Sequence, residues 1–240
     1  MGDGYGQCKS ARKTDRDVIN LVKFKAVIFD LDGTLIDSMG IWTQVDHDFL
    51  AKRNISVPVN LFDDIQVGNS YVEVAEHFKR KFNLPDSAED IMNEWTEMVA
   101  WHYKNDIPLK AGAKEFLTFL HKNGIKIGVG TSNIHRLTKV VLSANYVWHY
   151  VDAVVDGQEN LRGKPLPDIF LRVAEKLGVL PHECLVIEDV IAGVKAAKNA
   201  GMTAFAIEDD YSLKDKERIL EYVDFYAKDF HEIKERLSAT

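Results

Sequence analysis

Short apolar runs alternate with longer amphipathic segments from Phe24 onward, and this alternation restricts the fold more than any other feature of the chain. The runs are rich in β-branched and aliphatic residues, a composition typical of strands that are buried on both faces of a sheet. They are Ala26–Phe29, Ile125–Val129, Ala153–Val155, Cys184–Ile187 and Thr203–Ile207. The pattern predicts an α/β fold with a doubly wound parallel sheet that is covered by helices on both faces.

Three of the intervening segments have the apolar spacing of helices. They are Ala113–Lys122, Ile169–Leu177 and Ala192–Ala200. Gly178 and Gly201 follow the last two segments, at the position where a glycine commonly ends a helix. We expect these helices to cover the sheet.

The interval between residues 39 and 107 differs from the rest because it contains no comparable strand run. Its apolar residues recur at helical spacing, for example at Ile41 and Val45. We therefore predict that residues 39–107 form an inserted α-helical cap domain. Residues 24–38 and 108–240 then form one core domain from two pieces of sequence.

The first 23 residues have a different composition, rich in Gly, Lys, Arg and Asp. An apolar pattern begins only at Val18. We predict that residues 1–23 form a flexible N-terminal tail.

The charge balance excludes several kinds of partner. The chain has 30 Lys and Arg against 37 Asp and Glu, a net charge of −7, so its surface is not built to neutralise nucleic-acid phosphates or anionic lipid. Its two cysteines, Cys8 and Cys184, make neither a disulfide framework nor a zinc motif. No apolar run is long enough to span a membrane, and the N-terminus lacks the apolar core of a signal peptide. We expect a cytoplasmic protein that binds neither nucleic acid nor membrane.

Polar residues follow three of the predicted strands, at the sheet edge where α/β proteins bind ligands. Together with a loop lysine, these residues are Asp30, Asp32, Gly33, Thr131, Ser132, Asn133, Lys164, Glu188 and Asp189. The predicted sheet therefore brings carboxylates, hydroxyls and one ammonium group to a common edge.

Asp30 and Asp32 are separated by one residue, and this spacing needs more explanation than helix capping provides. Crowded carboxylates raise each other's pKa unless a cation lies between them. Mg²⁺ suits such oxygen ligands and keeps waters and substrate phosphate in its shell. Glu188 and Asp189, at another strand end, complete a candidate Mg²⁺ site, although the same pair could instead cap the next helix.

Thr131, Ser132 and Asn133 offer hydroxyl, amide and backbone N–H donors at a predicted helix start. Such donors suit a bound anion, and they also suit plain helix capping. A loop lysine is usually only solvated, so Lys164 is a candidate because of the groups expected beside it. Asp168 is expected to cap the helix that follows it.

Four segments in this order resemble the motifs of the haloacid dehalogenase superfamily of phosphotransferases. They are Asp30–Thr34, Thr131–Asn133, Lys164–Asp168 and Glu188–Asp189. The helical insertion after the first segment resembles the cap of the β-phosphoglucomutase-like branch. The resemblance covers Phe24 to the last strand region, and it implies a Rossmann-like core and an enzyme that uses Mg²⁺ and forms an aspartyl phosphate.

The resemblance also implies a role for each matching residue. Asp30 resembles the nucleophile, and Asp32 resembles the general acid and base that also binds metal through its backbone carbonyl. The implied metal ligands are Asp30, Asp32, Glu188 and Asp189. The implied phosphate-binding residues are Gly33, Thr131, Ser132, Asn133 and Lys164, the last of which is also catalytic. Ser38 and the stretch Ile107–Pro108 correspond to hinges on which the cap closes.

Two departures from that branch bear on the substrate. Its sugar-phosphate mutases typically have a histidine where this chain has Trp42, and an arginine in the cap segment that corresponds to Val67–Tyr71. A mutase must hold a second phosphate, and no cationic group for it is evident here. The sequence therefore favours simple hydrolysis of a small phosphorylated metabolite.

Two alternatives to a phosphatase remain at this point. One is a sugar-phosphate phosphomutase. The other is a non-catalytic phospho-receiver, which would use a strand-end Asp, a Thr and a Lys to hold a phosphoryl switch. The second aspartate, Asp32, and the long insertion argue against a receiver, because a slow switch needs neither a leaving-group acid nor a lid.

Overall fold

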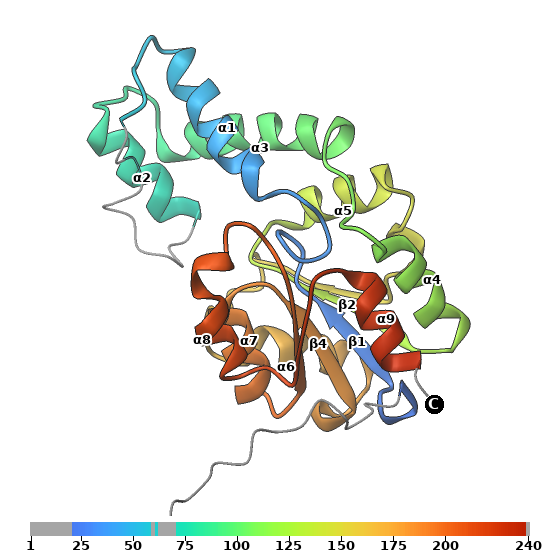
Figure 1. Cartoon of the computed structure of the whole chain (residues 1–240). Coiled ribbons are helices and arrows are strands. Elements are labelled where there is room, and N and C mark those ends of the chain that lie inside the picture. The colour runs from blue at the N-terminus through green and yellow to red at the C-terminus, as the bar shows by residue number, and fades with distance from the viewer. Residues whose placement is uncertain (1–20, 59–60, 62–70, 239–240) are drawn as a thin grey trace, which may run out of the picture.

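The computed structural model describes residues 21–58, 61 and 71–238. A parallel sheet of six strands lies at the centre, with helices on both faces and three further helices beyond its carboxyl edge (Figure 1). The strands are β1 (Ala26–Phe29), β2 (Lys126–Gly130), β3 (Ala153–Val155), β4 (Cys184–Glu188), β5 (Thr203–Ile207) and β6 (Phe225–Ala227). The predicted α/β class and doubly wound parallel sheet are confirmed.

The strand order β3-β2-β1-β4-β5-β6 places β1 at the centre of the sheet. Phe29 pairs with Val129 on one side and with Ile187 on the other. The connections run outward from β1 in one direction and then, starting with β4, in the other. Their loops therefore diverge beyond the carboxyl ends of β1 and β4, where a crevice forms in this topology.

Six helices cover the two faces of the sheet. They are α4 (Ala113–Lys122), α5 (His135–Ala144), α6 (Asp168–Leu177), α7 (Ile191–Asn199), α8 (Lys216–Leu220) and α9 (Phe230–Ser238). Val27 and Phe29 share one buried cluster with α4, α5 and α9, whereas Ala26 and Ile28 share another with α6, α7 and α8. This alternation along β1 follows from the two-residue period of a strand.

The other three helices are α1 (Met39–Ala51), α2 (Tyr71–Lys81) and α3 (Ala88–Asn105), and we refer to them as the cap helices. Phe49, Phe78 and Trp95 form their aromatic core, with the Trp95 ring 4.9 Å from Phe78 and 5.4 Å from Phe49 between centroids. Ser87 and Asp90 form a capping box that begins α3. The cap helices thus have apolar packing of their own.

Two connecting segments join the cap helices to the core and run side by side. The Asp37 N–H donates to Pro108 (3.0 Å), and the Lys110 N–H donates to Leu35 (3.1 Å). The α3 helix also packs on α5, where Arg136 forms a bidentate ion pair with Glu97. The predicted boundaries at residues 38 and 108 fall at this paired linker, and the hinge role of Ser38 and Ile107–Pro108 stays a prediction.

Several details differ from the expectations. The edge strand β6 and the helix α9 are not among the predicted strands and helices. Asp168 does not cap α6, because its carboxylate pairs with Arg162 instead (2.8 Å). The predicted tail lies outside the described residues up to residue 20, and so does most of Val67–Tyr71. Among the described helices, none combines the length and apolar character that crossing a membrane requires.

Candidate active site

Lys164 lies between two carboxylates at the carboxyl ends of β1 and β4. Its Nζ donates to Asp30 Oδ1 (2.5 Å) and to Glu188 Oε1. Asp30 directly follows β1, Glu188 is the last residue of β4, and all three side chains are buried or nearly so. The loop before α6 therefore delivers one cation to the two neighbouring strand ends.

The protonation of these groups reflects burial and mutual repulsion. Burial, together with the charges of Glu188 and Asp32, raises the pKa of Asp30 to about 7, against the attraction of Lys164. Burial alone would lower the pKa of Lys164, but the carboxylates of Asp30 and Glu188 raise it above its usual value. The lysine is therefore charged, and Asp30 is poised to ionise when more positive charge arrives.

Asp189 has one carboxylate oxygen that finds no hydrogen bond within the described part of the chain. Its Oδ1 accepts from the Thr34 hydroxyl (2.7 Å), whereas Oδ2 is buried and unpaired. Burial, followed by repulsion from Glu188 and Asp30, raises the pKa of Asp189 well above its usual value. Gly33 has a left-handed φ of +78°, and a Cβ there would lie 2.6 Å from this same oxygen. Glycine at position 33 thus leaves this buried oxygen without a steric clash, and the oxygen can serve as a ligand for a cation.

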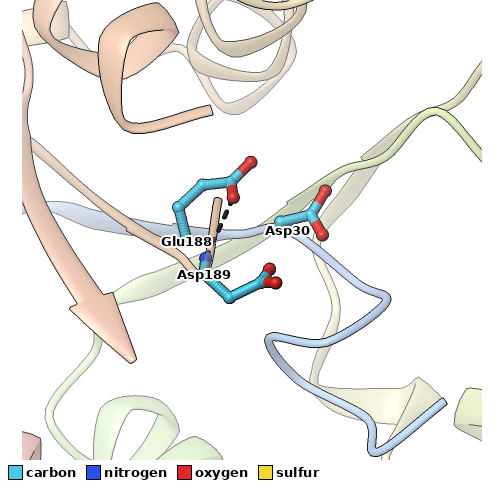
Figure 2. Close-up of side chains that lie close together, drawn as sticks. All are labelled: Asp30, Glu188 and Asp189. Carbon is cyan, nitrogen blue, oxygen red and sulfur yellow. Dashed lines mark hydrogen bonds between the residues drawn. The ribbon is translucent and has the colours of Figure 1, made fainter. Parts of the chain in front are cut away.

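Figure 2 shows the three carboxylates of Asp30, Glu188 and Asp189 gathered at the ends of β1 and β4. One oxygen from each lies within 4.8 Å of the others. Hard divalent cations prefer a set of oxygen ligands like this one. The residues present therefore fit Mg²⁺.

Glu188 has two further contacts that hold it in place. Its Oε2 accepts the backbone N–H groups of Asp189 (3.0 Å) and Val190 (3.2 Å), just before α7. Glu188 thus binds the two residues before α7 and no N–H group of the helix itself, so the capping alternative considered for this pair is not confirmed. A Cβ at Gly193 would clash with the Glu188 carboxylate, so α7 can approach only with a glycine at that position.

The Asp32 carboxylate lies outside the three-carboxylate cluster and is held by three donors. Ser38 donates to Oδ1 (2.6 Å), Asn133 Nδ2 donates to Oδ2 (2.9 Å), and the Tyr103 hydroxyl donates to Oδ1. Tyr103 is a residue of α3 that is only 1% exposed, and it also accepts from Asn133 Nδ2 (3.0 Å). The core, the linker and the cap helices therefore meet at one carboxylate.

The segment after β2 combines local turn bonds with groups that face the crevice. Thr131 Oγ1 accepts the backbone N–H of Asn133 (3.0 Å), and Asn133 Oδ1 accepts that of Ile134 (2.8 Å). Ser132 makes no side-chain bond among the described residues and is exposed. Its hydroxyl and that of Thr131 remain able to donate to an anion.

A cavity of about 300 Å³ lies between the cap helices and the core. Its polar side consists of Asp32, Ser132 and Asn133. Its apolar side consists of Met39, Trp42, Val74, Ile134 and Leu137. We refer to this cavity as the cleft pocket.

The structure thus brings the predicted residues together in two adjoining groups. Asp30, Lys164, Glu188 and Asp189 form one group, and Asp32, Ser132 and Asn133 line the cleft pocket. Tyr103 was not among the predicted residues, because a tyrosine at helical spacing with buried neighbours is the usual sign of simple core packing. Its position close to the linker is the only sequence signal that could have suggested more.

Thermal stability without and with Mg²⁺ tests the candidate metal site independently of any activity assay. The pKa values of Asp30 and Asp189 exceed the ordinary value of 3.8. Between about pH 4 and pH 7 the folded protein therefore holds more protons than the unfolded chain does. Its metal-free stability should fall across that window. Saturating Mg²⁺ should then raise the Tm by about 5 °C or more at pH 8, and by less at pH 5.

Thermal unfolding in chelator and then in Mg²⁺ measures both effects. The matched control is Asp189→Asn, which removes the unpaired oxygen and should lose most of the Mg²⁺ shift. An equal Mg²⁺ shift at both pH values, or an undiminished shift in Asp189→Asn, would contradict the proposed site.

Replacement of Gly193 by alanine tests the close approach of α7 to Glu188. Alanine normally stabilises a helix interior relative to glycine by about 0.5–1 kcal/mol. Here the clash should reverse the sign and destabilise the fold by about 1–3 kcal/mol. The matched control is Gly40→Ala in α1, where the nearest atom to the added Cβ is 3.7 Å away, so the substitution should stabilise. Denaturant unfolding of both variants checks the two opposite signs.

Comparisons with known proteins agree with this geometry. The family model of haloacid dehalogenase-like hydrolases matches residues 24–201. A (DL)-glycerol-3-phosphatase of Arabidopsis thaliana is 33% identical over 192 residues, which cover 76% of this chain and 63% of that protein. A β-phosphoglucomutase of Bacillus subtilis is 30% identical over 195 residues, which cover 76% and 83%. The chain spans about half to two thirds of the length of two curated relatives that it matches (48% and 63%).

The solved structures include close relatives of the whole fold. A haloacid dehalogenase hydrolase from Entamoeba histolytica has a TM-score of 0.75 at 26% identity, and the match covers 89% of this chain and 98% of that one. The family match extends over well more than half of the chain and contains all the residues of the two groups. The chain therefore belongs to the haloacid dehalogenase-like hydrolases.

Proposed function

We propose that this protein is a Mg²⁺-dependent phosphatase that hydrolyses a small phosphate monoester through an aspartyl-phosphate intermediate. The observation that carries the proposal is the group of Asp30, Lys164 and two further carboxylates directly beside the cleft pocket. Family membership and the phosphatases among the relatives support the same reaction class. A phospho-receiver is not supported, because the chain belongs to a hydrolase family.

The proposed reaction has two transfers. In the first, an Asp30 oxygen attacks phosphorus, the bond from phosphorus to the alcohol oxygen breaks, and Asp32 gives its proton to the departing oxygen. In the second, water attacks phosphorus while Asp32 takes a proton from it. The bond between Asp30 and phosphorus then breaks, which releases phosphate and restores both aspartates.

The charged groups around Asp30 have distinct proposed tasks. Lys164 lies against the nucleophile and offers its charge to the phosphoryl oxygens, while Glu188 fixes the lysine in place. Asp30 and Asp189 are the proposed direct Mg²⁺ ligands, with Asp32 contributing its backbone carbonyl. Mg²⁺, when bound, supplies positive charge that neutralises the transferring group. Thr131 and Ser132 are the proposed donors to the same oxygens.

Hydrolysis is favoured over the mutase alternative by the lining of the cleft pocket. A mutase holds a second phosphate, yet the lining contains no Lys, Arg or His among the described residues. Trp42 takes the place of the histidine that is typical of the mutases. The similarity to a β-phosphoglucomutase keeps the mutase as the second candidate.

Asp30→Asn tests the nucleophile. Phosphate release from a metabolite panel in Mg²⁺ should fall by about a thousandfold or more, because an amide cannot form the acyl phosphate. Asp48→Asn, in α1 but not among the residues that line the cleft pocket, removes the same charge and should keep full activity. Full activity in Asp30→Asn would defeat the assignment. Incubation of the wild-type protein with glucose 1-phosphate and a trace of the bisphosphate separates the two candidates, because a mutase yields isomerised product and no free phosphate.

Tyr103→Phe tests the contact between the cap helices and Asp32. The variant keeps the buried ring and loses one donor to a charged acceptor, so kcat should fall about tenfold with little change in KM. Tyr150→Phe is the matched control, since its hydroxyl accepts from Thr118 (3.1 Å) on the far side of α4. Initial rates with both variants measure the effect. A raised KM at constant kcat would show that Tyr103 serves ground-state binding instead.

A further inference from the structure

The apolar wall of the cleft pocket is built from both the core and the cap helices. Ile134 and Leu137 line it from the start of α5, and Met39 and Trp42 line it from the start of α1. Val74 of α2 completes the lining on the cap side. The members of each pair are three residues apart, which places them beside each other on one helical face. Two apolar faces therefore border the pocket, one from each side.

This wall begins directly beside the phosphate end of the site. Met39 Cγ lies 3.1 Å from the position that a Cβ would take at Gly33, and Gly33 follows Asp32 in the chain. On the core side, Ile134 directly follows Asn133. An alcohol esterified to a phosphoryl group at this end thus has apolar side chains beside it on both sides.

The polar groups of the lining are largely occupied by one another. The Asp32 carboxylate accepts three hydrogen bonds, one of them from Asn133 Nδ2 (2.9 Å). Asn133 is fully used as well, because Nδ2 also donates to Tyr103 and Oδ1 accepts from the Ile134 N–H (2.8 Å). Of the three polar residues in the lining, Ser132 is the one whose hydroxyl makes no hydrogen bond within the described chain, and its proposed partner is the phosphoryl group.

Hydroxyl groups on the alcohol would therefore lose water without gaining partners in this pocket. Each such group lowers affinity by about threefold to tenfold. A hydrocarbon portion instead gains from burial, and Trp42 offers it the largest apolar surface of the wall. At the roughly 30 Å³ that a water-sized group occupies in a liquid, the cavity of about 300 Å³ holds about ten non-hydrogen atoms. The phosphate group takes about half of them.

We propose that the substrate is a phosphate monoester of a small apolar alcohol, with about five carbons at this cavity volume, and that its hydrocarbon portion lies against Trp42. Trp42 is then a specificity-determining residue. This inference rests on the proposed phosphatase function and deepens it by naming the class of alcohol that is released.

Two pairs of esters with equal carbon chains test the substrate class. Propyl phosphate is compared with glycerol 3-phosphate, and pentyl phosphate with xylitol 5-phosphate. In Mg²⁺ the wild-type kcat/KM should be about tenfold higher for the apolar ester in the first pair. It should be about a hundredfold higher in the second pair, which differs by more hydroxyl groups. Equal kcat/KM within each pair, or preference for the polyol esters, would overturn the proposal.

Trp42→Gln tests the residue, with Trp101→Gln as the matched control. The glutamine amide adds a donor and an acceptor where the indole offered apolar surface, so the ratio of kcat/KM between the pentyl and xylitol esters should fall about tenfold. Trp101 is 59% exposed in α3 and does not line the cleft pocket, so its variant should keep the wild-type ratio. An unchanged ratio in Trp42→Gln, or an equal change in both variants, would show that Trp42 does not contact the alcohol.

Val74→Thr is a second variant that does not depend on how Trp42→Gln folds. It replaces one methyl group of the pocket lining by a hydroxyl of similar size, so the same ratio should fall about threefold. Thermal unfolding of all the variants confirms that they fold. A ratio that stays at the wild-type value in Val74→Thr would contradict an apolar alcohol at this wall.

Binding measurements separate this inference from the proposed function. Calorimetry of the four esters with the Asp30→Asn protein in Mg²⁺ gives their affinity order without turnover. If the wild-type protein hydrolyses none of them but the apolar esters bind more tightly, the phosphatase proposal fails and the apolar specificity stands. If all four are hydrolysed equally well, the apolar specificity fails and the phosphatase proposal stands.

Discussion

Electrostatic repulsion among buried carboxylates at two adjacent strand ends is the constraint on which the rest of the core depends. Burial of a single charge costs several kcal/mol, and three acidic side chains share this small volume. Lys164 offsets part of that cost for Asp30 and Glu188, and backbone N–H groups offset part of it for Glu188. Asp189 is left with one unpaired oxygen. The remaining repulsion raises the pKa values of Asp30 and Asp189, so that bound protons offset part of the negative charge.

The parallel sheet and the two glycines make this arrangement sterically possible. Adjacent parallel strands place Asp30 and Glu188 at the same edge, and the N–H groups of Asp189 and Val190, just before α7, donate to Glu188. Gly193 lets α7 pack against Glu188, and Gly33 lets the Asp189 carboxylate approach the backbone after β1. The cap helices contribute nothing to this charge balance. They instead supply Tyr103 to Asp32 and most of the apolar wall of the pocket.

The sequence was sufficient for most of the sheet and for the members of the charged group, because buried strands and strand-end carboxylates are local patterns. The runs Ala26–Phe29, Ala153–Val155 and Thr203–Ile207 coincide with β1, β3 and β5. The edge strand β6 escaped prediction because Phe225–Ala227 contains no β-branched residue and lies directly between two charged residues. Tyr103 escaped because its partner Asp32 is distant in the sequence, and side-chain hydrogen bonds across such separations leave no periodic signal. Asp168 was misassigned because Arg162 competes for its carboxylate.

The bond between Tyr103 and Asp32 has a consequence for the resting enzyme. A buried phenol loses a charged acceptor whenever the cap helices move away from the core, so separation carries a free-energy cost even without ligand. The arrangement in which the cap helices contact the core is thereby favoured. Any movement of the cap helices that admits a ligand then competes with this internal hydrogen bond, which links the rate of ligand exchange to Asp32, the proposed general acid and base.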